Sequence, residues 1–150
     1  MPVISAGDAK FIQEHFAKNL VGDVQIVYFT QRESVLLIPS QECAYCQQTR
    51  ELLGEVAALS DKLHLEVHDF VAEEALAQEL GVDRIPAFVL RGAARGRVRY
   101  FGIPAGYEFS TLIEDIVDVS RGTTDLSSDT LEALAGLPGD AHIQVFVTPT

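Results

Sequence analysis

The chain has 150 residues, which suits one domain large enough to bury a hydrophobic core. It carries 22 acidic and 11 basic side chains, a formal net charge of −11, with the acidic residues spread along the sequence. This charge argues against nucleic acid or an anionic membrane surface as a partner, because phosphates would be repelled. No apolar run approaches the ~20 residues of a membrane helix, and residues 1–20 lack a signal-peptide core, so we expect a cytoplasmic protein.

The first predicted elements are a helix and a strand. Ser5 is a candidate N-cap for a helix over about 8–20, whose apolar face would comprise Phe11, Ile12, Phe16 and Leu20. After a Gly-Asp turn, residues 24–29 are rich in β-formers and predict a strand. The segment 31–42 contains an apolar run ended by a proline, which allows either a short extra strand or a packed loop.

Two cysteines, the only ones in the chain, lie three positions apart as Cys43 and Cys46. They directly precede a predicted helix that runs to about Ser60 and carries an apolar stripe of Leu52, Leu53, Val56 and Leu59. Cys43 therefore lies at or near a helix N-terminus, where unpaired N–H groups and the helix dipole favour a thiolate. A thiolate one turn from a second thiol is the working part of a disulfide exchange enzyme.

The two cysteines are expected to have different roles. Cys43 should be the more exposed nucleophile, with a pKa below the ~8.5 of a free thiol, and Cys46 the more buried resolving thiol. Tyr45, between them, is a candidate for the rim of a substrate groove. In a reducing compartment a lone cysteine pair is more often catalytic, redox-sensing or metal-bound than structural. The chain has one Asn, one Met and no Trp, a weak indication of a thermophilic source.

The middle of the chain alternates between predicted strands and helices. Period-two alternation indicates a strand over 63–68, and a short helix follows over 72–80, ended by a glycine. A proline opens the next predicted strand, within 85–90. A glycine-rich turn joins it, as a hairpin, to a strand over 97–101. The helix over 108–120 would bury Phe109, Leu112, Ile113, Ile116 and Val117.

We expect two parts in the chain: a complete unit over 1–122, and a linker with the start of a second, truncated unit over 123–150. The composition turns polar after the first unit, and a short helix is predicted over 131–134. The β-forming run 143–147 repeats the pattern of 24–30, and both follow a helix and a turn with Gly and Asp. This spacing indicates an internal repeat with a period of about 118 residues.

The predicted order of elements is that of the thioredoxin-like α/β fold, a central mixed sheet flanked by helices, with an added N-terminal helix. The chain resembles the N-terminal unit of the tandem glutaredoxin-like protein disulfide oxidoreductases. The matching runs are Tyr100–Gly106, Glu108–Phe109, Glu114–Ser120 and Val145–Thr150. The N-terminal region of the flavoprotein subunit of bacterial alkyl hydroperoxide reductase is similar but more distant, and there the first unit has usually lost its cysteines. The segment 31–42 looks several residues longer than is usual in the family.

The resemblance implies a thiol–disulfide oxidoreductase that exchanges disulfides with protein substrates. It implies that Pro86 is cis and that the backbone of Ile85 holds an extended substrate strand by β-addition. An acidic residue beside the active helix, Asp69 or Glu66, would then accept the proton of Cys46. The family needs no metal or organic cofactor, and its expected reductant is a thioredoxin-reductase-like flavoprotein.

Other interpretations of the same residues stay open. One is an inert cysteine pair, and another is a non-catalytic docking or electron-relay domain of a larger redox protein. A zinc module is a remote alternative, because Cys43-x2-Cys46 is followed by His64-x3-His68. The intervening 17 residues exceed the usual ~12–15, and the histidines follow a strand pattern where a zinc finger needs a helix. Arg84 either orients an acidic substrate or glutathione, or is simply solvated.

Overall fold

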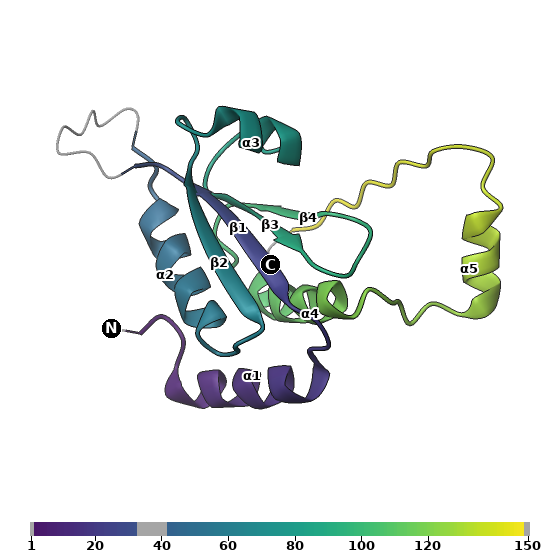
Figure 1. Cartoon of the computed structure of the whole chain (residues 1–150), viewed down its shortest axis with the longest axis horizontal. Helices are drawn as coiled ribbons and strands as arrows, with labels where there is room; N and C mark the ends of the chain where they lie inside the picture. Colours follow the sequence, from purple (N-terminus) through teal and green to yellow (C-terminus); the bar gives the residue numbers. More distant parts are fainter. Residues whose placement is uncertain (1, 33–41, 149–150) are drawn as a thin grey trace.

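A single mixed sheet forms the centre of the computed structural model, which describes residues 2–32 and 42–148 (Figure 1). Its strands lie in the order β2-β1-β3-β4, with β1 parallel to β2, and β3 antiparallel to both β1 and β4. The bounds of the strands are β1 Val24–Thr30, β2 Leu63–Asp69, β3 Ala87–Arg91 and β4 Val98–Phe101. All four match strands predicted from the sequence. The apolar run near Pro39, for which a strand or a loop was predicted, lies outside the described residues.

The register brings several chain segments to one end of the sheet. Thr30 at the end of β1 pairs with Asp69 at the end of β2. Phe29 pairs with Ala87 at the start of β3, and Ala87 pairs in turn with Phe101 at the end of β4. The loops after β1, β2 and β4 and the loop before β3 therefore meet at this end, which we call the Cys43 end because the loop after β1 leads to that residue.

Helices cover both faces of the sheet (Figure 1). Three of them, α1, α2 and α4, contribute to the larger core cluster on one face, and α3 contributes to the smaller cluster on the other. The helices and their bounds are α1 Ala6–Asn19, α2 Cys46–Ala57, α3 Glu74–Leu80, α4 Tyr107–Arg121 and α5 Ser128–Ala135. Each was expected from the sequence, to within a few residues at its ends.

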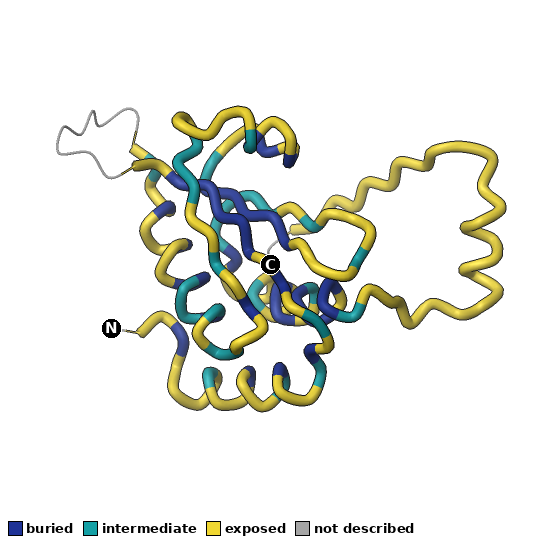
Figure 2. Tube along the Cα trace, viewed as in Figure 1, coloured by how far each residue is buried: buried dark blue, intermediate teal, exposed yellow. Residues whose placement is uncertain are grey.

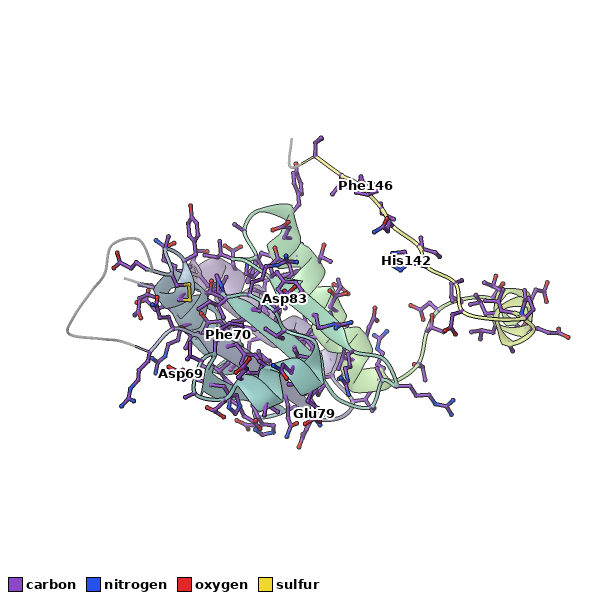
Figure 3. All side chains as sticks on the ribbon, turned by 90° about the horizontal axis from the view of Figure 1, so that it is seen from above. Asp69, Phe70, Glu79, Asp83, His142 and Phe146 are labelled. Carbon is purple, nitrogen blue, oxygen red and sulfur yellow. A yellow bond between two sulfur atoms is a disulfide. The ribbon has the colours of Figure 1, made fainter. Side chains whose placement is uncertain are left out.

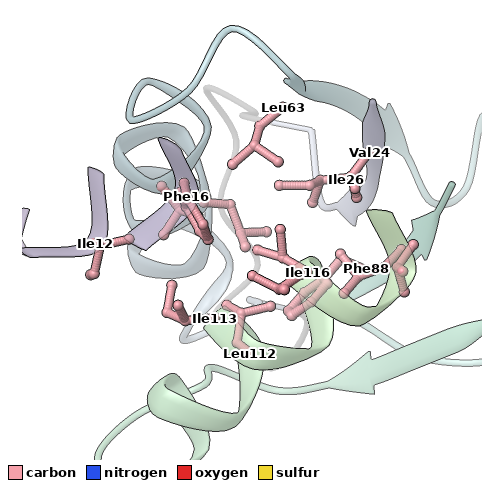
Figure 4. Packing of buried hydrophobic residues seen from close by; sticks show 14 of the residues in the cluster. Ile12, Phe16, Val24, Ile26, Leu63, Phe88, Leu112, Ile113 and Ile116 are labelled. Carbon is pink, nitrogen blue, oxygen red and sulfur yellow. The ribbon is translucent and has the colours of Figure 1, made fainter. Parts of the chain in front are cut away.

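The larger core cluster lies between the sheet and helices α1, α2 and α4 (Figure 4). Side chains from four directions meet there, among them Phe16, Ile26, Leu53, Phe88 and Ile116, all at most 1% exposed. The smaller cluster lies between α3 and the other face of the sheet. It comprises Val27, Phe29, Ala77, Leu80, Val82, Ala87 and Val89. Alternate residues of β1 belong to the two clusters. Both faces of this central strand are therefore buried, which explains why apolar residues follow one another along its sequence.

The helix ends follow the expected chemistry. The Ser5 hydroxyl accepts a hydrogen bond from the backbone N–H of Asp8 at 3.1 Å, which caps α1 as predicted. Helix α4 ends at Gly122 with φ of 66°, where a Cβ atom would lie 2.8 Å from the carbonyl oxygen of Ala93. The prediction that Phe11 lies on the buried face of α1 was wrong, since Phe11 is 70% exposed. Only Ile12 and Phe16 of this helix are buried, so the buried face is narrower than the row of apolar residues in the sequence.

The strand β2 lies at an edge of the sheet, and Leu63 is its one buried residue. Leu63 and Leu65 contribute to the larger cluster. The alternation then places His64, Glu66 and His68 on the opposite face, the face of α3.

Residues 123–148 add nothing to either core cluster: from Gly122 onward every described residue is exposed (Figure 2). The predicted short helix is confirmed as α5, with its N-cap hydroxyl Ser127 accepting from the N–H of Thr130. The prediction of a strand over 143–147 was wrong for this structure, since no described strand pairs with this segment and a strand forms only with a partner. Phe146 is 88% exposed and stands away from the sheet in Figure 3.

Among the helices of the described residues, none has the length and apolar run that crossing a membrane requires.

Candidate functional site

The two cysteines form a disulfide at the start of α2, with an S–S distance of 2.00 Å and a Cα–Cα distance of 5.5 Å (yellow in Figure 3). Cys46 is the first residue of the helix, and its backbone N–H donates to the carbonyl of Cys43 at 3.4 Å. Cys46 is buried at 5% exposure, whereas Cys43 is partly exposed. The predicted difference in exposure between the two cysteine residues is therefore confirmed.

The cysteine pair lies at the N-terminus of α2. The first turn of α2 carries no acidic residue, and the N-cap, Tyr45, makes no side-chain capping bond within the described residues. The positive end of the helix dipole is therefore left for the sulfur atoms. The N–H of Cys43 itself is held by the Oε1 atom of Gln31 at 2.7 Å, which ties the cysteine loop to the end of β1.

Two buried hydroxyl groups lie beneath the first turn of α2. Tyr28 is 0% exposed, and its hydroxyl donates to the backbone carbonyl of Cys46 at 2.7 Å. Thr49, also 0% exposed, donates its hydroxyl to the carbonyl of Tyr45 at 2.8 Å. Burial raises the pKa of Tyr28 above its usual 10.0, so the phenol stays protonated and remains a donor at neutral pH.

A groove of about 720 Å³ opens beside Cys43 at the Cys43 end of the sheet. Three chain segments line it: Gln31, Arg32, Glu42 and Cys43 after β1, Asp69, Phe70, Val71 and Ala72 after β2, and Ile85 before β3. The Ile85–Pro86 peptide bond is cis, as predicted. Pro86 is buried behind Ile85, and its carbonyl accepts from the N–H of Gly102 at 2.8 Å. Tyr45 is 54% exposed and is not among the described residues that line this groove.

The two carboxylates considered as proton acceptors lie in different places. Asp69 lines the groove with Cys43, and its Oδ1 atom accepts from the N–H groups of Val71 and Ala72 at 3.0 and 2.7 Å. Glu66 lies on the α3 face of β2, where its Oε2 atom is 3.5 Å from Nε2 of His68. The structure therefore brings Asp69, and not Glu66, to the groove.

The residues of the zinc alternative do not come together. His68 Nδ1 lies 2.6 Å from a carboxylate oxygen of Glu73, and His64 Nε2 lies 3.5 Å from one of Asp23. Both cysteine sulfurs are bonded to each other. Within residues 2–32 and 42–148, no group of three or more His, Cys, Asp or Glu side chains is placed to hold a metal ion.

Arg84 lies on the surface next to Ile85. Its guanidinium sits 4.6 Å from the ring centre of Phe101 and its Nε atom 3.6 Å from a carboxylate oxygen of Asp83. These contacts lie near the Cys43 end, and the Arg84 side chain remains largely exposed.

Three features of the site escaped the sequence analysis: the Tyr28 hydroxyl, the Gln31 side chain and the Phe70–Ala72 wall of the groove. A hydroxyl within an apolar strand and a polar residue directly after that strand were the available signals. Neither signal shows that the hydroxyl of Tyr28 or the amide of Gln31 contacts a cysteine, because these contacts depend on how the cysteine loop and α2 pack against β1.

Comparisons with known proteins agree with this geometry. A family model described as "Thioredoxin domain" matches residues 34–114. The F subunit of the alkyl hydroperoxide reductase of Staphylococcus epidermidis is 30% identical over 104 residues, 69% of this chain and 18% of that protein. The corresponding protein of Pseudomonas putida is 29% identical over 118 residues, 73% of this chain and 23% of that protein. The chain thus spans less than a quarter of the length of these curated relatives.

Solved structures share the fold of this chain. A protein disulfide oxidoreductase from Aeropyrum pernix superposes with a TM-score of 0.72 at 27% identity, covering 90% of this chain and 56% of that one. The F subunit of the alkylhydroperoxide reductase of Enterococcus faecalis, at a TM-score of 0.73 and 22% identity over 90% of this chain and 61% of that one, shares the fold. With more than half of its length matched by the family model, the chain belongs to the thioredoxin domain family, and its CxxC pair, Cys43 and Cys46, forms a disulfide redox centre.

Proposed function

We propose that the chain is a thiol–disulfide oxidoreductase that exchanges disulfides with protein substrates through Cys43 and Cys46. The observation that supports this most is the position of the pair: a disulfide at a helix N-terminus, with the partly exposed Cys43 on a groove that Ile85 also lines. An extended substrate segment would lie in this groove and pair with the backbone before cis-Pro86.

In the reducing direction, the Cys43 thiolate attacks one sulfur of a substrate disulfide. A mixed disulfide forms, and the other substrate sulfur leaves as a thiolate. Cys46 then loses its proton and attacks the Cys43 sulfur, which closes the Cys43–Cys46 disulfide and releases the second substrate thiolate. Two electrons pass from the protein to the substrate, whose two thiolates each take up a proton. The opposite direction oxidises a substrate dithiol by the same steps.

Asp69 is the better-placed acceptor for the Cys46 proton, since its carboxylate lines the groove and that of Glu66 faces the other side of the sheet. Closing the disulfide consumes the dithiol, so a turnover cycle needs an external dithiol or a flavoprotein reductase. We propose a flavoprotein of the thioredoxin-reductase type for this role, acting in a reducing compartment such as the cytoplasm.

A second candidate function is a docking or electron-relay domain within a larger redox protein. The similarity to the F subunit of alkyl hydroperoxide reductase favours it, because this chain matches only a small part of that protein. We also propose that residues 1–122 form the active unit and that 123–150 comprise a linker and the start of a second unit of the same kind.

The test is the reduction of insulin disulfides by dithiothreitol with the wild-type chain, Cys43→Ser and Cys46→Ser. We expect the wild-type chain to accelerate the reaction, Cys43→Ser to lose the acceleration, and Cys46→Ser to trap mixed disulfides at Cys43. A wild-type rate equal to that of dithiothreitol alone would exclude the oxidoreductase function. Activity that appears only when a flavoprotein reductase is added would favour the relay domain.

A further inference from the structure

The buried face of β1 carries one tyrosine hydroxyl, that of Tyr28, in a position that an apolar side chain could fill. Tyr28 is 0% exposed and belongs to the larger core cluster. A phenylalanine ring would fill the same space without the free-energy cost of burying a polar group. The buried hydroxyl therefore needs hydrogen-bond partners: it donates to the backbone carbonyl of Cys46 at 2.7 Å, and the hydroxyl groups of Thr30 and Thr49 also interact with it.

The position of Tyr28 makes this hydrogen bond a rigid link. Its backbone lies in the central strand of the sheet, paired with Val67 of β2 on one side and Phe88 of β3 on the other. Cys46, in contrast, follows a loop that begins at the end of β1. The Tyr28 hydroxyl thus joins Cys46, the first residue of α2, directly to β1, a strand that is hydrogen-bonded on both sides.

A second hydroxyl acts on the neighbouring carbonyl. Thr49 donates both its hydroxyl, at 2.8 Å, and its backbone N–H, at 2.9 Å, to the carbonyl of Tyr45. Tyr28 and Thr49 together hold the two consecutive carbonyl groups at the start of α2. Both donors are fully buried, so water does not compete for these hydrogen bonds.

We propose that Tyr28 is a positioning residue for the redox pair: its hydroxyl fixes Cys46 so that the resolving sulfur stays within reach of Cys43. The inference rests on the proposed function, because it concerns the step in which Cys46 attacks the mixed disulfide at Cys43. In that step the Cys43–Cys46 bond forms, the bond from Cys43 to the substrate breaks, and the substrate sulfur leaves as a thiolate. Without the hydroxyl, the effective concentration of Cys46 at the Cys43 sulfur falls.

The experiment compares Tyr28→Phe with the wild-type chain. Each reduced protein is mixed with glutathione disulfide, quenched with acid at successive times and analysed by mass spectrometry, which separates the glutathione adduct from the closed disulfide. We expect closure to slow about fivefold in Tyr28→Phe, the effect of losing one hydrogen bond of about 1 kcal/mol, so that the adduct accumulates. The rate of Cys43 alkylation by iodoacetamide should stay the same, because the hydroxyl contacts Cys46.

The chain provides a matched control in Tyr100→Phe. Tyr100 packs against the same core cluster, stacks on Phe88 and donates its hydroxyl to Glu108, a residue of α4, whereas the Tyr28 hydroxyl donates to Cys46. Closure should keep its wild-type rate in this variant. An unchanged closure rate in Tyr28→Phe, equal slowing in Tyr100→Phe, or an effect confined to Cys43 alkylation would each overturn the proposal.

Two further outcomes remain interpretable. If Tyr28→Phe fails to fold, Tyr28→Met, which also removes the hydroxyl donor to Cys46, takes its place: slower closure supports the proposal, and unchanged closure overturns it. Glutathione is small and needs no groove, so the closure rate does not depend on protein substrates. A wild-type chain that closes its disulfide after glutathione but does not reduce insulin would refute the proposed function and leave the comparison for Tyr28 valid.

Discussion

The replacement Leu53→Ala should separate the contribution of the α2 core face from that of the disulfide. Leu53 is 0% exposed and lies in the larger core cluster. Burial of a leucine side chain contributes about 2–3 kcal/mol, and the cavity left by truncation adds to the loss. We therefore expect the free energy of unfolding to fall by about 3–4 kcal/mol, a large part of the ~5–15 kcal/mol typical of a domain.

Leu59→Ala makes the same chemical change on the same apolar stripe and serves as the control. Leu59 follows the end of α2 and is only partly buried, so its truncation should cost about 1–2 kcal/mol. Both variants would be unfolded in urea with the disulfide intact and again after reduction, with circular dichroism as the signal. Equal losses for Leu53→Ala and Leu59→Ala would refute this account, because the two side chains differ in burial and not in chemistry.

Two further predictions concern pH and backbone conformation. Burial, and then the charge of Asp118, raise the pKa of Asp115 above its usual 3.8, so the folded state binds this proton more tightly than the unfolded state. Stability should therefore decline as the pH rises from 3.8 through the raised pKa. Asp115→Asn should flatten this decline in urea unfolding curves recorded at a series of pH values, and parallel curves for variant and wild type would contradict the prediction. Gly122→Ala should destabilise the protein by about 1–3 kcal/mol, because φ is 66° and the new Cβ meets a backbone carbonyl. Gly54→Ala, inside α2 with nothing within 4 Å of the new Cβ, should instead stabilise it by about 0.5–1 kcal/mol, and thermal unfolding that shows the same sign for both changes would refute the distinction.

Much of the fold could be predicted because local patterns and tertiary packing agree. The apolar run of β1 is buried on both faces, and the stripe of α2 faces the core with Leu52, Leu53 and Val56. The resemblance to a known family supplied the cis geometry of Pro86, which a local pattern does not specify. The relative exposure of the two cysteines follows from their positions before and within the first turn of a helix.

The errors, and the choices that the sequence left open, arise where a side chain depends on distant neighbours. Phe11 fits the apolar stripe of α1, but no sequence pattern shows how wide a face the rest of the protein covers. Glu66 and Asp69 are close in sequence, yet the pleat of β2 turns one carboxylate away from the groove. The run 143–147 has the composition of a strand and lacks a described partner, so composition alone could not decide its structure.

The position of the end of α4 relative to the disulfide determines how a domain joined after α4 could reach Cys43. The backbone N–H of Gly22, just before β1, donates to the carbonyl of Ser120 at the end of α4 at 3.2 Å, so both segments meet at the end of the sheet opposite Cys43. The seven residues of β1 span about 23 Å. The segment that follows α4 therefore begins at the end of the sheet far from the disulfide. A domain tethered through this segment reaches Cys43 only if the linker runs back along the sheet, which is the direction that the trace after α5 takes in Figure 1.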